Sequence, residues 1–142
     1  MRIVTFIIIC LLALACVNNK SNSADSPKEE GIAKFEILQD FHNFGDLKAG
    51  ETVAFSFEIK NTGNTGLLIK KLETDCGCID VEYPKEKINP DDSAYIEVIF
   101  NSAGEVGRVY KTITVFTNAE EEGSLAISAT VKNELINLYS KN

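Results

Sequence analysis

The sequence predicts an all-β protein whose folded part is a sandwich of seven strands. Apolar and polar residues alternate over several stretches after residue 33. Clusters of Gly, Asn, Pro and Asp separate these stretches, and no apolar stripe of helical period has a useful length. Strands at this spacing are typical of a β-sandwich. We expect the sandwich over residues 33–133, followed by a C-terminal tail at 134–142.

Residues 1–15 have the pattern of a signal peptide. Arg2 supplies a positive charge, and the run from Ile3 to Ala15 is apolar except for Thr5. Its 13 residues are too few to cross a bilayer core, which needs about 20 in a helix. The Leu-Ala-Leu-Ala-Cys ending resembles the lipobox, which implies cleavage before Cys16 and lipid on its thiol. The alternative is an ordinary secretory signal with an incidental Cys.

Residues 16–32 are expected to be the lipidated Cys16 and a flexible tether, because they are rich in Ser, Asn and charge without periodic apolar positions. Two or more acyl chains on Cys16 would anchor the protein stably to a membrane. Val17 stands where an Asp often retains lipoproteins in the inner membrane, so the outer membrane is favoured. The sequence leaves open whether the protein faces the periplasm or the cell surface.

The net charge of −7 excludes some partners. Nucleic acid requires a basic face for its phosphates, and adsorption to anionic lipid requires one as well. Loss of Arg2 with the signal peptide would make the mature chain still more acidic. We therefore expect no nucleic-acid partner, and membrane attachment through the acyl chains alone.

The clearest strand alternation runs from Val53 to Ile59, and it recurs from Ala94 to Phe100. The predicted strands are 33–44, 52–61, 67–74, 78–83, 93–101, 108–117 and 124–132. Seven strands match an immunoglobulin-like sandwich, although the Cys, Trp and Cys arrangement of antibody domains is absent. The expected core consists of Phe55, Phe57, Ile96, Val98, Phe100, Ile113, Val115 and Ile127.

Several short motifs occur in a fixed order: His42-Asn43-Phe44-Gly45-Asp46-Leu47, Asn61-Thr62-Gly63, Thr74-Asp75-Cys76-Gly77-Cys78 and Ile88-Asn89-Pro90-Asp91-Asp92. In this combination the chain resembles, over about residues 33–132, the bacterial domain-of-unknown-function family 1573. That family is related to the immunoglobulin-like domains of HYDIN and major sperm protein. The resemblance implies the sandwich fold and an envelope location, and it draws attention to Cys76 and Cys78. Pro90-Asp91 departs from the family's usual Pro-Gly, so a different turn is expected there.

Cys76 and Cys78 leave four interpretations open. They could form a local disulfide, bind a metal, exchange disulfides or serve as packing alone. Two thiolates suit Cu(I), whereas a structural zinc site requires four ligands and a catalytic zinc site keeps one position open. Gly77 is expected to let the chain turn tightly between them. Asp75 and Asp80 disfavour a reactive thiolate, because negative charge nearby raises a thiol pKa.

His42 is the only histidine of the chain. The expected strand directions place it at the same end of the sandwich as Cys76 and Cys78, beside the Phe44–Gly50 turn. His42, Cys76 and Cys78 could then form a three-ligand copper or zinc site. The alternative is that His42 is an edge residue, or that it belongs to a packing motif in which Phe44 is buried.

The expected function is therefore a lipid-anchored, immunoglobulin-like module of the cell envelope. It would serve interaction with an envelope protein, or envelope architecture, rather than catalysis. A single histidine must serve any catalytic scheme, and neither a nucleophile motif nor a phosphate-binding loop accompanies it. The alternative function is metal binding or thiol chemistry at Cys76 and Cys78. The first interpretation implies no cofactor, whereas the second implies bound copper or zinc.

Overall fold

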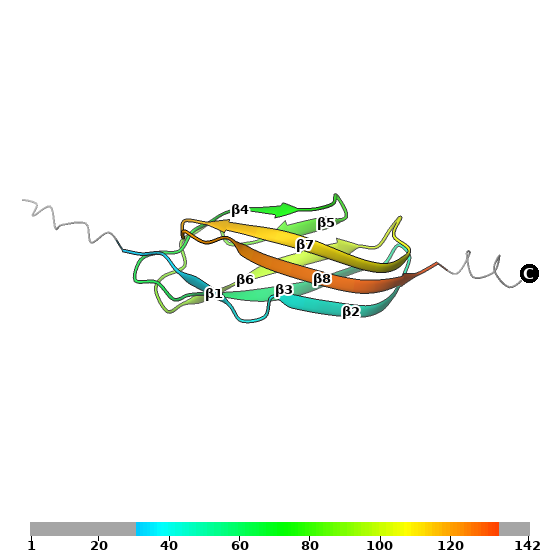
Figure 1. The fold of residues 1–142 in the computed structure, drawn as a ribbon, viewed down its shortest axis with the longest axis horizontal. Helices are drawn as coiled ribbons and strands as arrows, with labels where there is room; N and C mark the ends of the chain where they lie inside the picture. The colour runs from blue at the N-terminus through cyan, green and yellow to red at the C-terminus, as the bar shows by residue number, and fades with distance from the viewer. Residues whose placement is uncertain (1–30, 134–142) are drawn as a thin grey trace, which may run out of the picture.

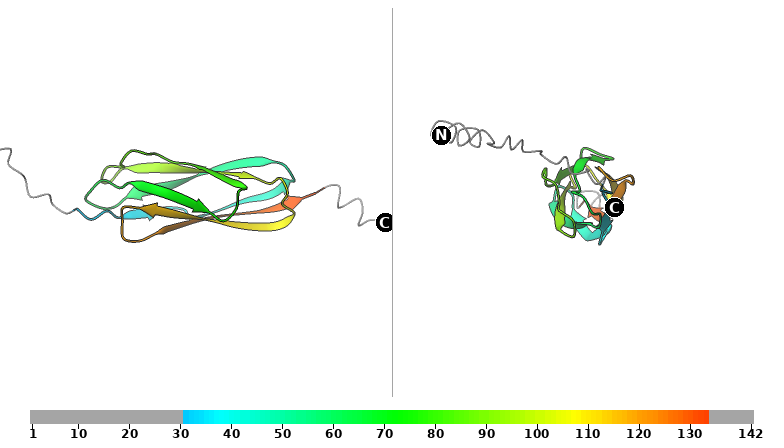
Figure 2. Two further views of the ribbon diagram at one scale, coloured as in Figure 1. Left: turned by 90° about the horizontal axis from the view of Figure 1, so that it is seen from above. Right: turned by 90° about the vertical axis from the view of Figure 1, so that its left-hand side faces the viewer.

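The computed structural model describes residues 31–133, which form two four-stranded β-sheets packed face to face (Figures 1 and 2). The strands are β1 (Phe35–Ile37), β2 (Phe41–Lys48), β3 (Thr52–Asn61), β4 (Ile69–Thr74), β5 (Ile79–Glu82), β6 (Ser93–Asn101), β7 (Gly107–Thr117) and β8 (Gly123–Lys132). The predicted all-β sandwich is confirmed. The signal peptide, Cys16, nearly all of the tether and the tail at 134–142 lie outside the described residues. Within residues 31–133, no helix is long and apolar enough to cross a membrane.

The sheets contain eight strands because the stretch predicted as one strand at 33–44 is divided between them. β1 pairs with β3 in the sheet ordered β1-β3-β6-β5. The chain then crosses over, and β2 pairs with β8 in the sheet ordered β2-β8-β7-β4. The β2–β8 pair is parallel, whereas the other strand pairs are antiparallel. One N-terminal stretch thus covers part of an edge of both sheets.

The core lies between the sheets, where every second residue of a strand points inward. Seven of the eight predicted core residues are buried there: Phe57, Ile96, Val98, Phe100, Ile113, Val115 and Ile127. Phe55 packs against this core but is only half-buried, so the prediction was wrong about its full burial. Phe55 lies on β3 at the side of the sandwich, where its ring stacks on His42.

Asn61 is a buried polar residue at the end of β3, although the sequence indicated only a turn there. Its side-chain Nδ2 donates hydrogen bonds to the carbonyl oxygens of Thr65 and Ile88, at 2.8 and 2.9 Å. Its Oδ1 accepts one from the Gly63 amide, at 2.9 Å. Asn61 thus ties the loop after β3 to the segment before β6, and a buried amide is stable only with such partners.

The turn at Asn89–Asp92 forms without the expected glycine. Asp91 has a φ of 67°, which glycine adopts most readily and aspartate tolerates. The Asp92 amide donates to the Asn89 carbonyl oxygen, as in a turn with positive φ at its third residue. The Asp91 amide also donates to the Asn61 carbonyl oxygen. The departure from Pro-Gly therefore changes the residue but keeps a tight turn.

Candidate functional site

Cys76 and Cys78 form a disulfide in the loop between β4 and β5, with their Cα atoms 5.2 Å apart. Both residues are partly buried and pack against the core. The loop joins the two sheets at the side of the sandwich away from β1 and β2. Of the four interpretations, this geometry matches the local disulfide. Because a disulfide offers no thiolate, metal binding would require its reduction.

Hydrogen bonds hold the disulfide loop to both sheets. A carboxylate oxygen of Asp75 accepts from the amide and the hydroxyl of Thr112 on β7, at 2.9 and 3.2 Å. The carbonyl oxygen of Cys78 accepts from the Asn101 amide on β6, at 2.9 Å. The expected tight turn at Gly77 is present, but it does not require glycine, because the φ of Gly77 is not positive and a Cβ there would meet no atom within 4 Å.

Replacing both Cys76 and Cys78 by Ser is expected to lower the free energy of unfolding by no more than about 1.5 kcal/mol. The residues are two positions apart, so the ring that they close removes little entropy from the unfolded chain. Urea denaturation of the non-reduced protein and the double variant measures the difference. A loss of about 3 kcal/mol or more would show that the bond is a main structural constraint.

His42 does not lie with the cysteines. β2 and β4 do run in the same direction, as expected, but they are the two outer strands of their sheet. Three strand spacings of about 4.8 Å separate them by roughly 14 Å. Within residues 31–133, no three His, Cys, Asp or Glu side chains are grouped to hold a metal ion. The predicted three-ligand site and the position beside the Phe44–Gly50 turn were therefore wrong.

His42 on β2 belongs to an aromatic cluster with Phe44 of the same strand and Phe55 of β3. Its ring is 3.8 Å from that of Phe55, nearly parallel, and 4.6 Å from that of Phe44, edge on. The edge-on contact with Phe44 falls in the usual range of about 4.5–7 Å for favourable aromatic pairs, whereas the stacked contact with Phe55 is closer than that range. Partial burial lowers the pKa of His42 from its ordinary value of 6.5, because desolvation disfavours the charged ring. His42 therefore packs against aromatic rings, as one of the alternative interpretations had it, although Phe44 is only half-buried.

The lowered pKa of His42 predicts a loss of stability in weak acid. Well above pH 6.5 the imidazole is neutral in both the folded and unfolded chain and contributes no pH dependence. As the pH falls below this value, the unfolded chain binds a proton that the folded chain still resists, so unfolding becomes easier. Urea denaturation at pH 7.5 and 5.5 should show a larger loss for the natural protein than for His42→Phe. Equal losses would contradict the prediction.

The outer face of the β2-β8-β7 strands carries an exposed aromatic pair that the sequence did not single out. Phe41 on β2 and Tyr110 on β7 have rings 6.3 Å apart, stacked at 19°. They lie across β8, where their cross-strand neighbours Ala126 and Ser128 are small. Arg108 lies on the same face, two residues before Tyr110. We name Phe41, Arg108 and Tyr110 the aromatic face.

A shallow hollow of about 440 Å³ adjoins the aromatic face. Its walls include Asn43, Arg108, Tyr110, Ser128 and Thr130. These side chains offer a guanidinium, an amide and three hydroxyls beside the exposed rings. Within residues 31–133, none of the ion pairs involves Arg108. The aromatic face thus combines exposed aromatic rings with a guanidinium that forms no ion pair within the described residues.

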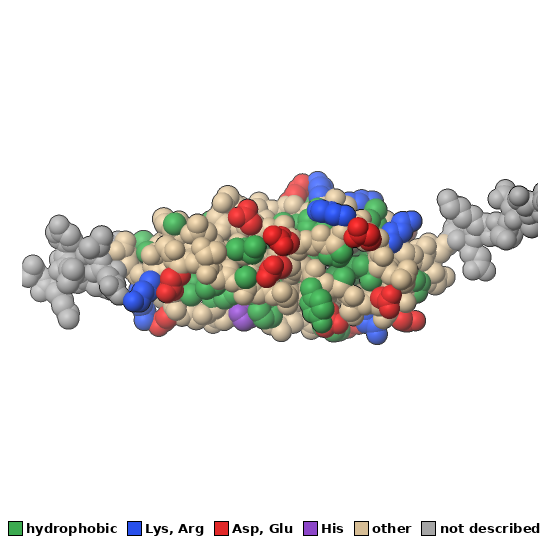
Figure 3. Space-filling view, turned by 180° about the vertical axis from the view of Figure 1, so that it is seen from behind, with side chains coloured by type: hydrophobic (Ala, Val, Ile, Leu, Met, Phe, Trp, Pro, Cys, Tyr) green, Lys and Arg blue, Asp and Glu red, His purple; other side chains and the backbone are tan. Residues whose placement is uncertain are grey.

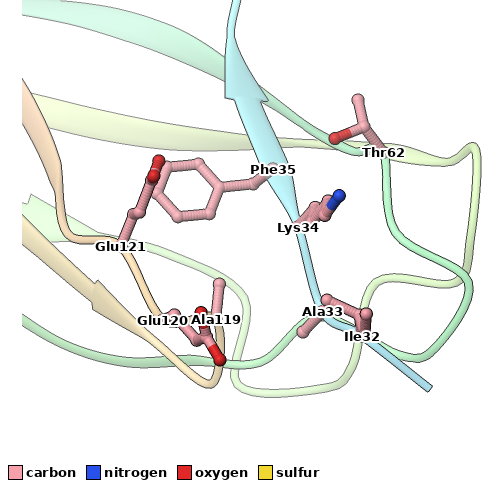
Figure 4. Close-up of a pocket in the computed structure, with 8 residues that line it drawn as sticks. All are labelled: Ile32, Ala33, Lys34, Phe35, Thr62, Ala119, Glu120 and Glu121. Atoms are coloured by element: carbon pink, nitrogen blue, oxygen red, sulfur yellow. The ribbon is translucent and has the colours of Figure 1, made fainter.

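A second hollow, of about 300 Å³, lies where the described chain begins. Figure 4 shows Phe35 on one side and the loop residues Ala119, Glu120 and Glu121 on the other. Lys34 and Thr62 also line it. Its lining offers apolar contact and charge, but no histidine, cysteine or serine for nucleophilic chemistry.

A family model described as a protein of unknown function, DUF1573, matches residues 35–131. None of the curated proteins matches the chain. Both findings leave the biochemical activity to be argued from the structure.

Several solved structures share the fold. A protein of unknown function from Porphyromonas gingivalis W83 is 18% identical with a TM-score of 0.59, over 70% of this chain and 46% of that one. The ASH/PapD-like domain 7 of human CEP192 is 14% identical with a TM-score of 0.60, over 70% of this chain and 86% of that domain. The chaperone YadV is 12% identical with a TM-score of 0.51, over 69% and 52%. This chain spans less than half the length of the Porphyromonas protein. At these identities the likeness establishes the fold alone.

Proposed function

The chain belongs to the DUF1573 family, and from that premise we propose that it is a lipid-anchored, non-enzymatic interaction module of the cell envelope. The PapD-like and immunoglobulin-like sandwich is consistent with binding another protein. The only histidine is held between aromatic rings, which supports a non-catalytic role. Its partner is a protein of the same compartment.

The aromatic face carries this proposal. The side chains of Phe41 and Tyr110 are 42% and 63% exposed, although burying such rings is favourable. Aromatic residues and Arg are enriched in protein interfaces and supply most of their hot spots. We assign to this face a partner surface that presents an apolar side chain to the two rings.

Arg108 determines the charge of that partner surface. It is one of only two arginines, the other being Arg2, in a chain of net charge −7. A carboxylate is the group that its planar guanidinium binds best, through two parallel hydrogen bonds. The partner therefore presents an Asp or Glu next to its apolar side chain.

A photoreactive crosslinking residue in place of Tyr110 tests the proposal, and the same replacement of Tyr95 is its matched control. Tyr95 is 61% exposed, close to the 63% of Tyr110, but it lies on β6 in the other sheet. In intact cells, position 110 should give one discrete crosslinked species that position 95 does not give. An equal yield of that same species at both positions would reject the aromatic face as the interface.

The anchor is tested separately, because Cys16 lies outside the described residues. Cys16→Ser is expected to release the protein from the membrane fraction or to leave it unprocessed, since acyl chains supply the attachment. The signal-peptide pattern before Cys16 supports this expectation. Intact mass of the membrane-bound protein gives the direct readout. An unmodified Cys16 would contradict lipid anchoring but not the aromatic face.

The Cys76–Cys78 disulfide supports a second candidate function, thiol–disulfide exchange or, once reduced, binding of Cu(I) or zinc. Two thiolates would be the ligands from this chain, without His42. The reduced protein, loaded with Cu(I) or zinc and desalted, should then retain stoichiometric metal, and the double Ser variant should not. Equal metal content in both proteins would reject this candidate for metal binding.

A further inference from the structure

One side of β3 lacks a strand partner over most of its length. β6 pairs with β3 from Thr52 to Lys60 on one side. On the other side β1 pairs only with Ile59–Asn61, and the Leu38 amide reaches the Glu58 carbonyl oxygen. Within residues 31–133, no strand pairs with Thr52–Phe57 on this side. We name this unpaired side of Thr52–Phe57 the β3 edge, where alternate residues direct backbone N–H and C=O groups outward.

The β3 edge differs from the other edges of the two sheets. Proteins guard exposed edges with charged side chains, bulges and short strands, because a bare edge invites another strand to pair. The other edges have such protective features. β4 carries Lys70, Lys71 and a register shift, and the four-residue β5 carries Asp80 and Glu82. β2 has a register shift between Asn43 and Asp46. The sequence Thr-Val-Ala-Phe-Ser-Phe of the β3 edge has no charge, Gly or Pro.

Side chains beside the β3 edge define what an added strand would contact. On the inner side, the stacked rings of His42 and the half-buried Phe55 form a largely apolar surface. Leu38, at the point where β1 leaves β3, is 56% exposed. On the outer side, Ala54 and Ser56 are small and exposed. An added strand would thus find an apolar surface inward and free space outward.

The outer face next to the β3 edge is acidic. Glu97 on β6 lies opposite Ser56 of β3 on one side and opposite Glu82 of β5 on the other. Glu58 is two residues from Ser56 on β3. Acidic side chains gather near the middle of this face in Figure 3. Within residues 31–133, none of the three carboxylates takes part in an ion pair. Lys or Arg on the outer side of an added strand would reach over Ser56 toward them.

We propose that the β3 edge accepts an extended segment of a partner protein, which adds a strand antiparallel to β3 and in line with β1. Backbone hydrogen bonds supply the affinity, and alternate side chains supply the specificity. The segment alternates apolar residues, which face His42 and Phe55, with Lys or Arg, which face Glu58 and Glu97. A second copy of this chain is a poorer occupant, because joining two copies here would bring two acidic faces together. This site is independent of the aromatic face, which lies on the other sheet.

A synthetic peptide tests the proposal with the full chain purified in detergent. The probe is the fluorescent peptide acetyl-Lys-Val-Lys-Ile-Lys-Val-amide, and its binding is followed by fluorescence anisotropy. N-methylation of one alternate set of its amides should weaken binding about tenfold or more, because those amides donate to β3. N-methylation of the other set should leave binding unchanged. No binding of the probe, or equal binding of both methylated forms, would overturn the proposal.

Charge controls complete the experiment. Replacing each Lys of the probe by Glu should abolish binding, and Ser56→Lys in the protein should weaken binding of the basic probe about tenfold. Ser124→Lys is the matched variant, because Ser124 is exposed on β8 of the other sheet; it should bind the probe normally. Circular dichroism verifies that both variants are folded.

Equal affinity for the acidic peptide, or a protein dimer in sedimentation that Ser56→Lys dissociates, would contradict the proposed partner. Crosslinking at position 110 should persist in Ser56→Lys, which separates this site from the aromatic face.

Discussion

Replacing Phe57 by Ala is expected to lower the free energy of unfolding by about 3–5 kcal/mol. The Phe57 side chain is 1% exposed and lies in the middle of β3, opposite Ile96. Removal of its ring forfeits the burial of a large apolar surface and leaves a cavity that two rigid sheets cannot close. Urea denaturation, extrapolated to water, measures the loss.

Tyr95→Ala is the control for Phe57→Ala. Tyr95 is an aromatic residue next to Ile96 in sequence, but it is 61% exposed. Its replacement should change the free energy of unfolding by no more than about 0.5 kcal/mol. Similar losses in the two variants would contradict the assignment of Phe57 to the core.

Asn61→Ala is expected to cost about 2–4 kcal/mol, nearly as much as the loss of a core side chain. The substitution removes the partner of the Ile88 and Thr65 carbonyl oxygens and of the Gly63 amide. Asn61 is fully buried, so water does not easily replace the lost hydrogen bonds. Thermal or urea denaturation measures this cost.

Asn118→Ala provides a matched comparison, because Asn118 makes the same kinds of bond at an exposed position. Its Oδ1 accepts from the Leu68 amide and its Nδ2 donates to the Gly66 carbonyl oxygen. Because water can reach these groups, the loss should be only about 1 kcal/mol. A cost for Asn61→Ala no greater than that for Asn118→Ala would contradict the argument from burial.

The strands were predictable because each buries one face, so that a two-residue period is visible in the sequence. Val53 to Ile59 and Ala94 to Phe100 show this period clearly and became β3 and β6. The division of 33–44 into β1 and β2 was not predictable in the same way. The period tells which residues face inward but not which sheet a strand joins, and β1 and β2 pair with opposite sheets.

The candidate site was less predictable than the fold, because it depends on the order of strands within a sheet. Strand direction was inferred correctly for β2 and β4, yet β7 and β8 lie between them and separate His42 from Cys76. The aromatic face escaped notice because Phe41 and Tyr110 are 69 residues apart and become neighbours only across β8. The sequence around Asn61 indicated only a turn. The burial of its side chain depends on the segment before β6, which is distant in sequence, and not on the residues next to it.

Crosslinking from position 110 in charge variants of Arg108 tests the central claim most directly. Arg108→Lys retains a cation and should retain most of the crosslinked species, whereas Arg108→Glu should lose it by repelling the partner's carboxylate. Arg108 is exposed and free of ion pairs within residues 31–133, so both variants should fold normally. The account predicts loss of the species in Arg108→Glu alone. Undiminished crosslinking in Arg108→Glu would contradict the aromatic face as a binding surface for an acidic partner.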